Sequence, residues 1–176
     1  KCQESQLWTE AIDAEIASIE DQTVWTEHFK TPRNLLHTTW VFCVKQNCHG
    51  DPVKYKARLC VQGFDQVHGI DYYKTWEPTG KLASLRMALI YGIKNNLQFT
   101  QFDVKSAFLH APLEEEVVIK TPQGFHRKSP YLLLLKSLYG LKQAPQNWYQ
   151  ILINWIKSQG FKESSCSFFF FIFFSC

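Results

Sequence analysis

The sequence predicts an α+β fold, because stretches with helical periodicity alternate with short strands and the clearest strand pair is an antiparallel hairpin. A length of 176 residues suits one domain with at most a small appendage. A hydrophobic share of 45% beside 20% charged residues is ordinary for a folded domain and excludes a wholly disordered chain.

The first predicted elements are a helix and a hairpin. Residues 4–20 carry hydrophobic side chains at helical spacing, namely Trp8, Ile12, Ile16 and Ile19. Residues 40–45 form a strand, residues 47–51 offer turn chemistry, and residues 53–61 alternate between apolar and polar side chains. The predicted hairpin therefore has one apolar face and one face that carries Lys54, Lys56 and Arg58.

The middle of the chain is less regular. Residues 63–80 read as a loop, and a second helix runs from Leu82 to about Asn95, with apolar residues at helical spacing. Residues 99–104 are expected to form a strand with Asp103 at its end, and residues 106–109 a short helix. Strands follow at 117–119 and 131–135, and Pro145 opens a final helix.

The charge and the cysteines leave several classes open. A net charge of +3 permits a nucleic-acid partner without arguing for one. No apolar run reaches the about 20 residues of a membrane-spanning helix, and no secretory signal is visible. Because the chain does not begin with Met, we expect its numbering to start inside a longer product. A chain of this size does not need disulfides to be stable, so we expect its cysteines to be reduced. Reduced thiols in turn indicate an intracellular protein, in the cytoplasm or the nucleus.

The alternative use of the cysteines is a zinc site. Four potential ligands cluster in sequence, namely Cys43, Cys48, His49 and Cys60. Their spacing matches none of the usual zinc patterns, and two of them fall inside predicted strands.

Two features could carry chemistry. The cations of the hairpin form either a solvated face or a ribbon that holds phosphate groups. Asp103 is either a helix cap or a metal ligand, since Mg²⁺ prefers oxygen ligands and substrate phosphates. Enzymes that transfer nucleotides use carboxylates to hold two such ions about 3.5–4 Å apart.

Several blocks in a fixed order decide between these readings. They are Lys-Tyr-Lys-Ala-Arg-Leu at 54–59; Gly63-Phe64 with Gln66; Gly69-Ile70-Asp71-Tyr72; Asp103-Val104 with Ala107-Phe108-Leu109; and Ser137 to Pro145 followed by Trp148-Tyr149. Upstream, Trp8, Glu15, Trp25 and Trp40-Val41-Phe42 fit the same order. Over residues 8–161 the chain resembles the reverse transcriptase domain of copia-type LTR retrotransposons.

The resemblance implies the fingers and partial palm of a right-hand polymerase, which uses an RNA template, a DNA primer, deoxynucleoside triphosphates (dNTPs) and Mg²⁺. Lys56 and Arg58 would hold the triphosphate. Asp103, with the carbonyl of Val104, would be the first metal ligand. Phe108 would exclude a 2′-hydroxyl, unless it is simply a core residue. Tyr139, Gly140, Lys142 and Pro145 would lie beside the nucleotide and template.

The chain departs from the family pattern after Asp103. A Tyr-x-Asp-Asp hairpin should complete the metal site, but none of the six Asp follows residue 103 and no two are adjacent. We therefore expect a partial reverse transcriptase domain at 1–161, which is truncated before the second half of the palm. An aberrant Phe-rich tail should follow at 162–176. The fragment should be catalytically inactive alone. The alternatives are a non-catalytic nucleic-acid-binding remnant and a non-functional pseudogene product.

Overall fold

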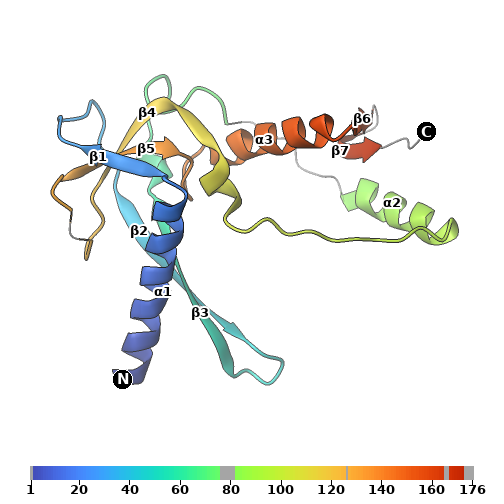
Figure 1. The fold of residues 1–176 in the computed structure, drawn as a ribbon, viewed down its shortest axis with the longest axis horizontal. Helices are drawn as coiled ribbons and strands as arrows, with labels where there is room; N and C mark the ends of the chain where they lie inside the picture. The colour runs from blue at the N-terminus through green and yellow to red at the C-terminus, as the bar shows by residue number, and fades with distance from the viewer. Residues whose placement is uncertain (1, 76–81, 126, 165–166, 173–176) are drawn as a thin grey trace. The chain divides into compact units, whose positions relative to one another are not determined.

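The structure is a computed structural model that describes residues 2–75, 82–125, 127–164 and 167–172 (Figure 1). The chain divides into two compact units. The first unit comprises residues 1–75 and 106–148, and the second comprises residues 76–105 and 149–176. The described residues include three α-helices and antiparallel sheets, which confirms the predicted α+β class.

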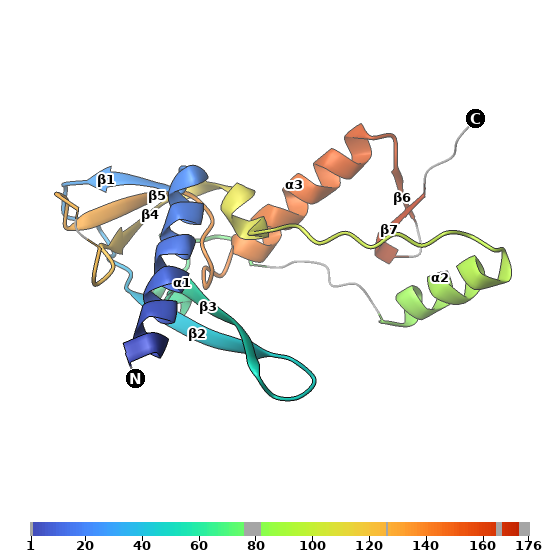
Figure 2. The ribbon, with the colours of Figure 1, turned by 60° about the horizontal axis from the view of Figure 1, so that its bottom comes forward.

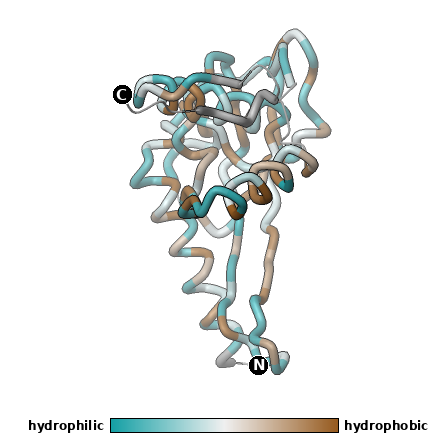
Figure 3. Tube along the Cα trace, turned by 90° about the vertical axis from the view of Figure 1, so that its right-hand side faces the viewer, coloured by the Kyte–Doolittle hydropathy of each residue, from teal (hydrophilic) through white to brown (hydrophobic). Residues whose placement is uncertain are grey.

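In the first unit a long helix lies along a hairpin. Helix α1 (Cys2–Asp21) runs beside strands β2 (Thr38–Gln46) and β3 (Pro52–Val61), as Figures 1 and 2 show from two directions. The indole of Trp8 packs edge-on against Phe42 and Tyr55, with ring centroids 5.0 and 4.8 Å apart. Hydrophobic and hydrophilic residues intermingle along these elements in Figure 3. The prediction that this helix covers apolar residues is confirmed.

The register of the hairpin separates its two faces. Leu59 lies opposite Trp40, and Lys56 lies opposite Cys43. Ala57, Leu59 and Val61 are buried, whereas Lys56 and Arg58, which alternate with them, are half-buried on the other face. The alternation predicted for residues 53–61 is thus confirmed in the half of β3 that joins the core.

A three-stranded antiparallel sheet provides the rest of the core. Its order is β1 (Trp25–His28), β5 (Tyr131–Lys136) and β4 (Pro112–Lys120). The buried cluster draws on all three strands, on β3 and on the loops, and includes Leu36, Leu59, Leu109, Val117, Ile119, Leu132, Leu134 and Leu138. One short 3₁₀ turn at Gly63–Asp65 follows β3, and another at Ala107–His110 precedes β4.

The second unit contains helix α2 (Leu82–Lys94), which confirms the predicted second helix. The strand predicted at 99–104 is wrong, because these residues have no regular structure. A strand needs a neighbour for its backbone groups, and none pairs with this segment among the described residues. Phe99 instead covers Gly92 of α2, where an added Cβ would lie 2.3 Å from its ring.

The chain ends in a helix and a small hairpin. Helix α3 (Ala144–Ser158) starts one residue before Pro145, as predicted. Strands β6 (Lys162–Ser164) and β7 (Ser167–Ile172) pair antiparallel within the predicted Phe-rich tail, residues 162–176. Across the described part of the chain, no helix combines the length and the apolar character needed to cross a membrane.

Candidate functional site

The outer edge of β3 is covered at two successive positions. The N–H of Leu59 donates to the Glu15 carboxylate of α1 at 3.4 Å, and the N–H of Val61 donates to the carbonyl of Tyr139 at 2.7 Å. Outward amides of an edge strand otherwise stay open to another chain. The strand that carries Lys56 and Arg58 is therefore fixed by α1 on one side and by the 139–142 turn near its end.

Two glycines allow this turn to approach the strand. Gly140 has a φ of +89°, and a Cβ built on it would lie 2.1 Å from the carbonyl oxygen of Val61. A Cβ on Gly63 would lie 2.1 Å from the carbonyl oxygen of Gly140. The backbones at 61, 63 and 140 are thus in direct contact, which leaves no room for a Cβ at position 63 or 140.

This contact brings three predicted site residues together. The Arg58 guanidinium carbon lies 5.9 Å from the centroid of the Tyr139 ring, within the range of a cation–π contact. The Phe108 ring meets Tyr139 edge-on at 5.7 Å. Phe108 and Tyr139 are half-buried and pack against the core cluster.

Burial changes the acidity of two groups at this place. Desolvation raises the pKa of Glu15, although the Leu59 N–H and the charges of Lys56 and Arg58 oppose the shift. Desolvation also raises the pKa of the Tyr139 phenol, against a hydrogen bond with Ser106. The carboxylate of Glu15 therefore interacts electrostatically with both cations, Lys56 and Arg58.

Lys142 is engaged with the loop that follows β3. Its backbone N–H donates to Oε1 of Gln66 at 2.8 Å. Its ammonium donates to the Gln66 carbonyl at 3.3 Å and to the Tyr72 hydroxyl at 3.4 Å, and lies 4.8 Å from the Tyr72 ring centroid. The predicted nucleotide-binding lysine thus contacts two residues of the protein, Gln66 and Tyr72.

A buried polar network continues from this lysine. Gln66, Asp71 and Gln143 are 5%, 2% and 1% exposed. Nε2 of Gln66 donates to Oε1 of Gln143 at 2.9 Å, and Nε2 of Gln143 donates to the carbonyl of Asp71 at 2.7 Å. In the sequence, these residues lie inside the motif blocks without a predicted role. The available signal was the position of these polar residues inside the blocks.

Asp103 and Val104 lie in the second unit and are exposed, so they are not among the residues that the first unit brings together. No three His, Cys, Asp or Glu side chains gather as a metal site anywhere in the described ranges. Cys43, Cys48 and Cys60 are free thiols. The donor set around Asp103 does not fit a two-metal centre, since the sequence supplies one aspartate there.

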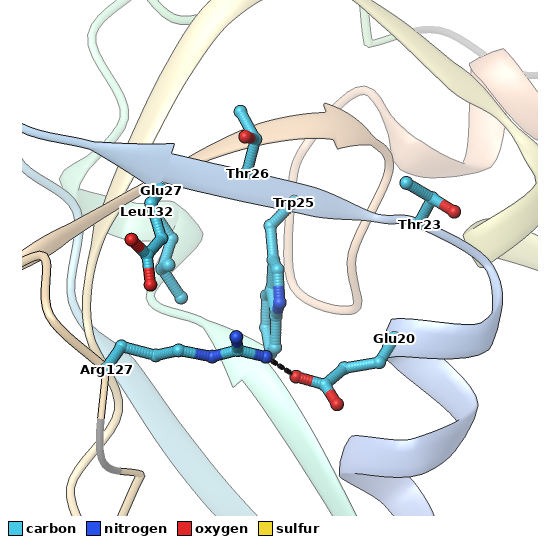
Figure 4. Close-up of a pocket in the computed structure, with 7 residues that line it drawn as sticks. All are labelled: Glu20, Thr23, Trp25, Thr26, Glu27, Arg127 and Leu132. Atoms are coloured by element: carbon cyan, nitrogen blue, oxygen red, sulfur yellow. Dashed lines mark hydrogen bonds and ion pairs between the residues drawn. The ribbon is translucent and has the colours of Figure 1, made fainter.

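A hollow of about 520 Å³ lies elsewhere in the first unit (Figure 4). It is lined by residues at the end of α1, on β1 and on β5, and an ion pair between Arg127 and Glu20 spans it. The buried indole N–H of Trp25 has no hydrogen-bond partner among the described atoms. None of the predicted site residues lines this hollow.

Comparison with known proteins identifies the domain. The family model for reverse transcriptase (RNA-dependent DNA polymerase) matches residues 23–174. The chain is 42% identical over 132 residues to the retrovirus-related Pol polyprotein from transposon TNT 1-94 of Nicotiana tabacum, covering 73% of this chain and 10% of that protein. It is 34% identical over 164 residues to the Pol polyprotein from transposon RE1 of Arabidopsis thaliana, covering 90% of this chain and 11% of that protein.

A more distant relative extends the comparison to yeast. The truncated transposon Ty1-A Gag-Pol polyprotein of Saccharomyces cerevisiae is 28% identical over 169 residues, which cover 91% of this chain and 14% of that protein. No solved structure matches the chain. The chain spans only about a tenth of the length of the first of these relatives. The blocks from β3 to α3 and these matches together show that the chain belongs to the reverse transcriptase family, as a fragment of the copia-type transposon branch.

Proposed function

We propose that this chain is the fingers and first half of the palm of an RNA-directed DNA polymerase, and that its first unit holds an incoming dNTP. The observation that carries the proposal is the cluster of Arg58, Phe108 and Tyr139 beside the glycine contact at Gly140. A cation next to half-buried aromatic rings offers a phosphate contact and an apolar wall in one place.

Each predicted residue has a role in this proposal. Lys56 and Arg58 bind the triphosphate. Phe108 excludes a ribose 2′-hydroxyl by its bulk, since that group is the difference between ribo- and deoxyribonucleotides. Tyr139 and Gly140 line the nucleotide, and Lys142 fixes the turn that carries them. In the parent polymerase the template is RNA and the primer is DNA.

The metal belongs to the parent polymerase. Mg²⁺ would neutralise the phosphates there, with the Asp103 carboxylate and the Val104 carbonyl among its ligands. The donors in this chain do not suffice for two ions, because a single aspartate stands where three carboxylates are needed. We expect no nucleotidyl transfer by this chain alone, and a primer-extension assay with Mg²⁺ tests this directly.

Equilibrium dialysis of the 176-residue chain with dNTP and Mg²⁺ tests the proposed nucleotide site. Lys56→Met and Arg58→Met should each weaken binding by about tenfold, the worth of one charge-assisted phosphate contact. Lys54→Met is the matched control, since Lys54 is on the same face but exposed and farther from Tyr139 along β3. Equal binding by all three variants would refute the assignment.

Phe108→Val provides a second arm for the sugar. The shorter side chain should admit a ribonucleoside triphosphate that the unaltered chain excludes. Binding of ATP and dATP by this variant should therefore become nearly equal. An unchanged preference for dATP would show that Phe108 serves the core rather than sugar selection.

A second candidate is a binding module for nucleic acid without turnover. The observation that favours this candidate is the register of the hairpin. Lys45 lies opposite Lys54, on the same face as Lys56 and Arg58. Binding of single-stranded RNA should then fall steeply with salt, because each phosphate contact releases counterions. If the folded chain binds neither RNA nor dNTP, it has no independent function.

A further inference from the structure

The polar network in the first unit joins two loops that are far apart in sequence. Gln66 and Asp71 belong to the loop after β3, and Gln143 follows the 139–142 turn. The side chain of Gln66 uses both ends of its amide: Oε1 accepts from the Lys142 N–H and Nε2 donates to Gln143. The side chain of Gln143 does the same between Gln66 and the backbone of Asp71.

Asp71 anchors the far end of this chain of hydrogen bonds. Its Oδ2 accepts from Nδ2 of Asn34 at 2.6 Å and from the Val67 N–H at 2.7 Å. Its own carbonyl accepts from Gln143. The side chain is 2% exposed, so the loop is folded around a carboxylate whose bonds lie inside the protein.

The network costs free energy unless all its members are present. A buried amide that loses one hydrogen-bond partner still carries the free-energy cost of its desolvation. The remaining hydrogen bonds of the network then lose their geometry as well. Gln66 and Gln143 each make two bonds with good lengths. Because each side-chain amide uses both its oxygen and its nitrogen, the network specifies one arrangement of the two loops.

We infer that Gln66 and Gln143, anchored by Asp71, are positioning residues that fix the 139–142 turn against β3 and so set Tyr139 beside Arg58. The inference rests on the nucleotide site proposed above. None of the three side chains contacts a nucleotide in this scheme. They act through the turn, which is also attached by the bond from the Val61 N–H to the Tyr139 carbonyl and by the bonds of the Lys142 ammonium to Gln66 and Tyr72.

The test compares Gln66→Met, Gln143→Met and the double variant with the unaltered chain. Methionine keeps the length of the side chain and removes its hydrogen bonds. Gln123→Met is the control, because Gln123 is exposed in a turn. We expect each single variant to weaken binding of Mg²⁺-dATP about tenfold, and the double variant to be no weaker, since both changes break one network. The control should bind as the unaltered chain does.

A second readout does not depend on nucleotide binding. Fluorotyrosine is incorporated, the ¹⁹F signal of Tyr139 is assigned by its absence in Tyr139→Phe, and the phenol is titrated. Burial raises its pKa, while the groups that face it, Glu15, Arg58, Cys60 and Ser106, are unchanged in the variants. When the turn loosens, the pKa should fall toward the value of free fluorotyrosine. A purely structural role elsewhere would leave this titration unchanged.

The outcomes separate the two proposals. If the unaltered chain binds no dATP, the nucleotide site is wrong, and the Tyr139 titration alone decides the positioning role. If it binds and the folded Met variants bind equally well, the inference is overturned whatever the titration shows. Should the Met variants not fold, Gln143→Glu keeps the acceptor for Gln66 and loses the donor to Asp71. An unchanged Tyr139 titration in that variant overturns the inference.

Discussion

At the scale of single residues, Gly140 combines two constraints that can be measured separately. Its φ of +89° strains any other residue, and the Val61 carbonyl fills the space where a Cβ would lie. Gly140→Ala should therefore cost about 3 kcal/mol or more of unfolding free energy, from strain and steric overlap together. Urea unfolding measures this cost.

Gly124 is the matched control for that substitution. It has a similar φ of +83°, but nothing lies within 4 Å of an added Cβ. Gly124→Ala should cost only the backbone strain, about 1–2 kcal/mol. Equal losses for the two variants would mean that the close approach at Val61 does not persist in solution.

Glu15 gives a prediction about pH. Desolvation raises its pKa in the folded chain above the ordinary 4.5, so the folded state binds a proton more tightly than the unfolded state. Its contribution to stability is then fully present below the unfolded pKa and is lost as pH rises through the folded pKa. Relative to Glu15→Gln, the unaltered chain should lose stability between pH 4 and pH 7.

Urea unfolding of both chains at the two pH values checks this sign. Gln at position 15 keeps an oxygen for the Leu59 N–H, so the hydrogen bond is matched and the charge is the variable. A relative gain in stability of the unaltered chain toward neutral pH would mean that Lys56 and Arg58 outweigh desolvation.

The limits of prediction at this scale follow from distance along the chain. Motif resemblance pointed to Arg58, Phe108 and Tyr139, and the first unit brings these three together. The bond between Gln66 and Gln143 spans 77 positions and has no local signature. The resemblance placed Gly140 beside the nucleotide and template, and it gave no sign that the backbone of Gly140 lies against Val61.

At the scale of elements, the contact between α1 and the hairpin depends on Trp8. Its ring touches Phe42 and Tyr55 edge-on. Trp8→Ala should destabilise the first unit by about 1–3 kcal/mol, because it removes two aromatic pairs and part of the covered area. Hydrogen exchange should quicken in residues 42–55, and Leu7→Ala, at an exposed neighbouring position, is the control. Equal protection in both variants would contradict this role.

Periodicity predicted the elements whose own residues show a regular hydrophobic spacing. It failed for segments whose structure depends on pairing with a distant strand. Helices α1 and α2 and the hairpin show clear spacing over many residues. Strand β1 has only four residues, and it is a strand because its backbone pairs with β5. Residues 99–104 have a strand-like composition without a partner, and they stay irregular. Local propensity cannot supply a neighbour.

At the scale of the whole molecule, the two units differ in how much apolar surface they cover. In α2, Met87, Ile90 and Ile93 are 71%, 66% and 68% exposed. Ile90→Lys and Ile93→Lys should therefore change the unfolding free energy by less than about 0.5 kcal/mol. They should also reduce self-association, which light scattering detects, because contiguous apolar surface promotes it.

Leu134→Lys is the contrasting variant, since Leu134 is 2% exposed in β5. It should unfold the first unit, because a buried ammonium lacks a partner there. A large loss of stability in Ile90→Lys would instead show that α2 is covered in solution.

The contact of Gly63 and Gly140 also bears on which chain lengths this fold tolerates. Val61 and Gly63 touch the same turn two residues apart. One inserted residue between them would carry Gly63 away from Gly140 and press a side chain against a carbonyl. Gly50, in the hairpin turn, faces open space. Insertions and deletions among relatives should therefore gather at 47–51 and be absent from 61–63.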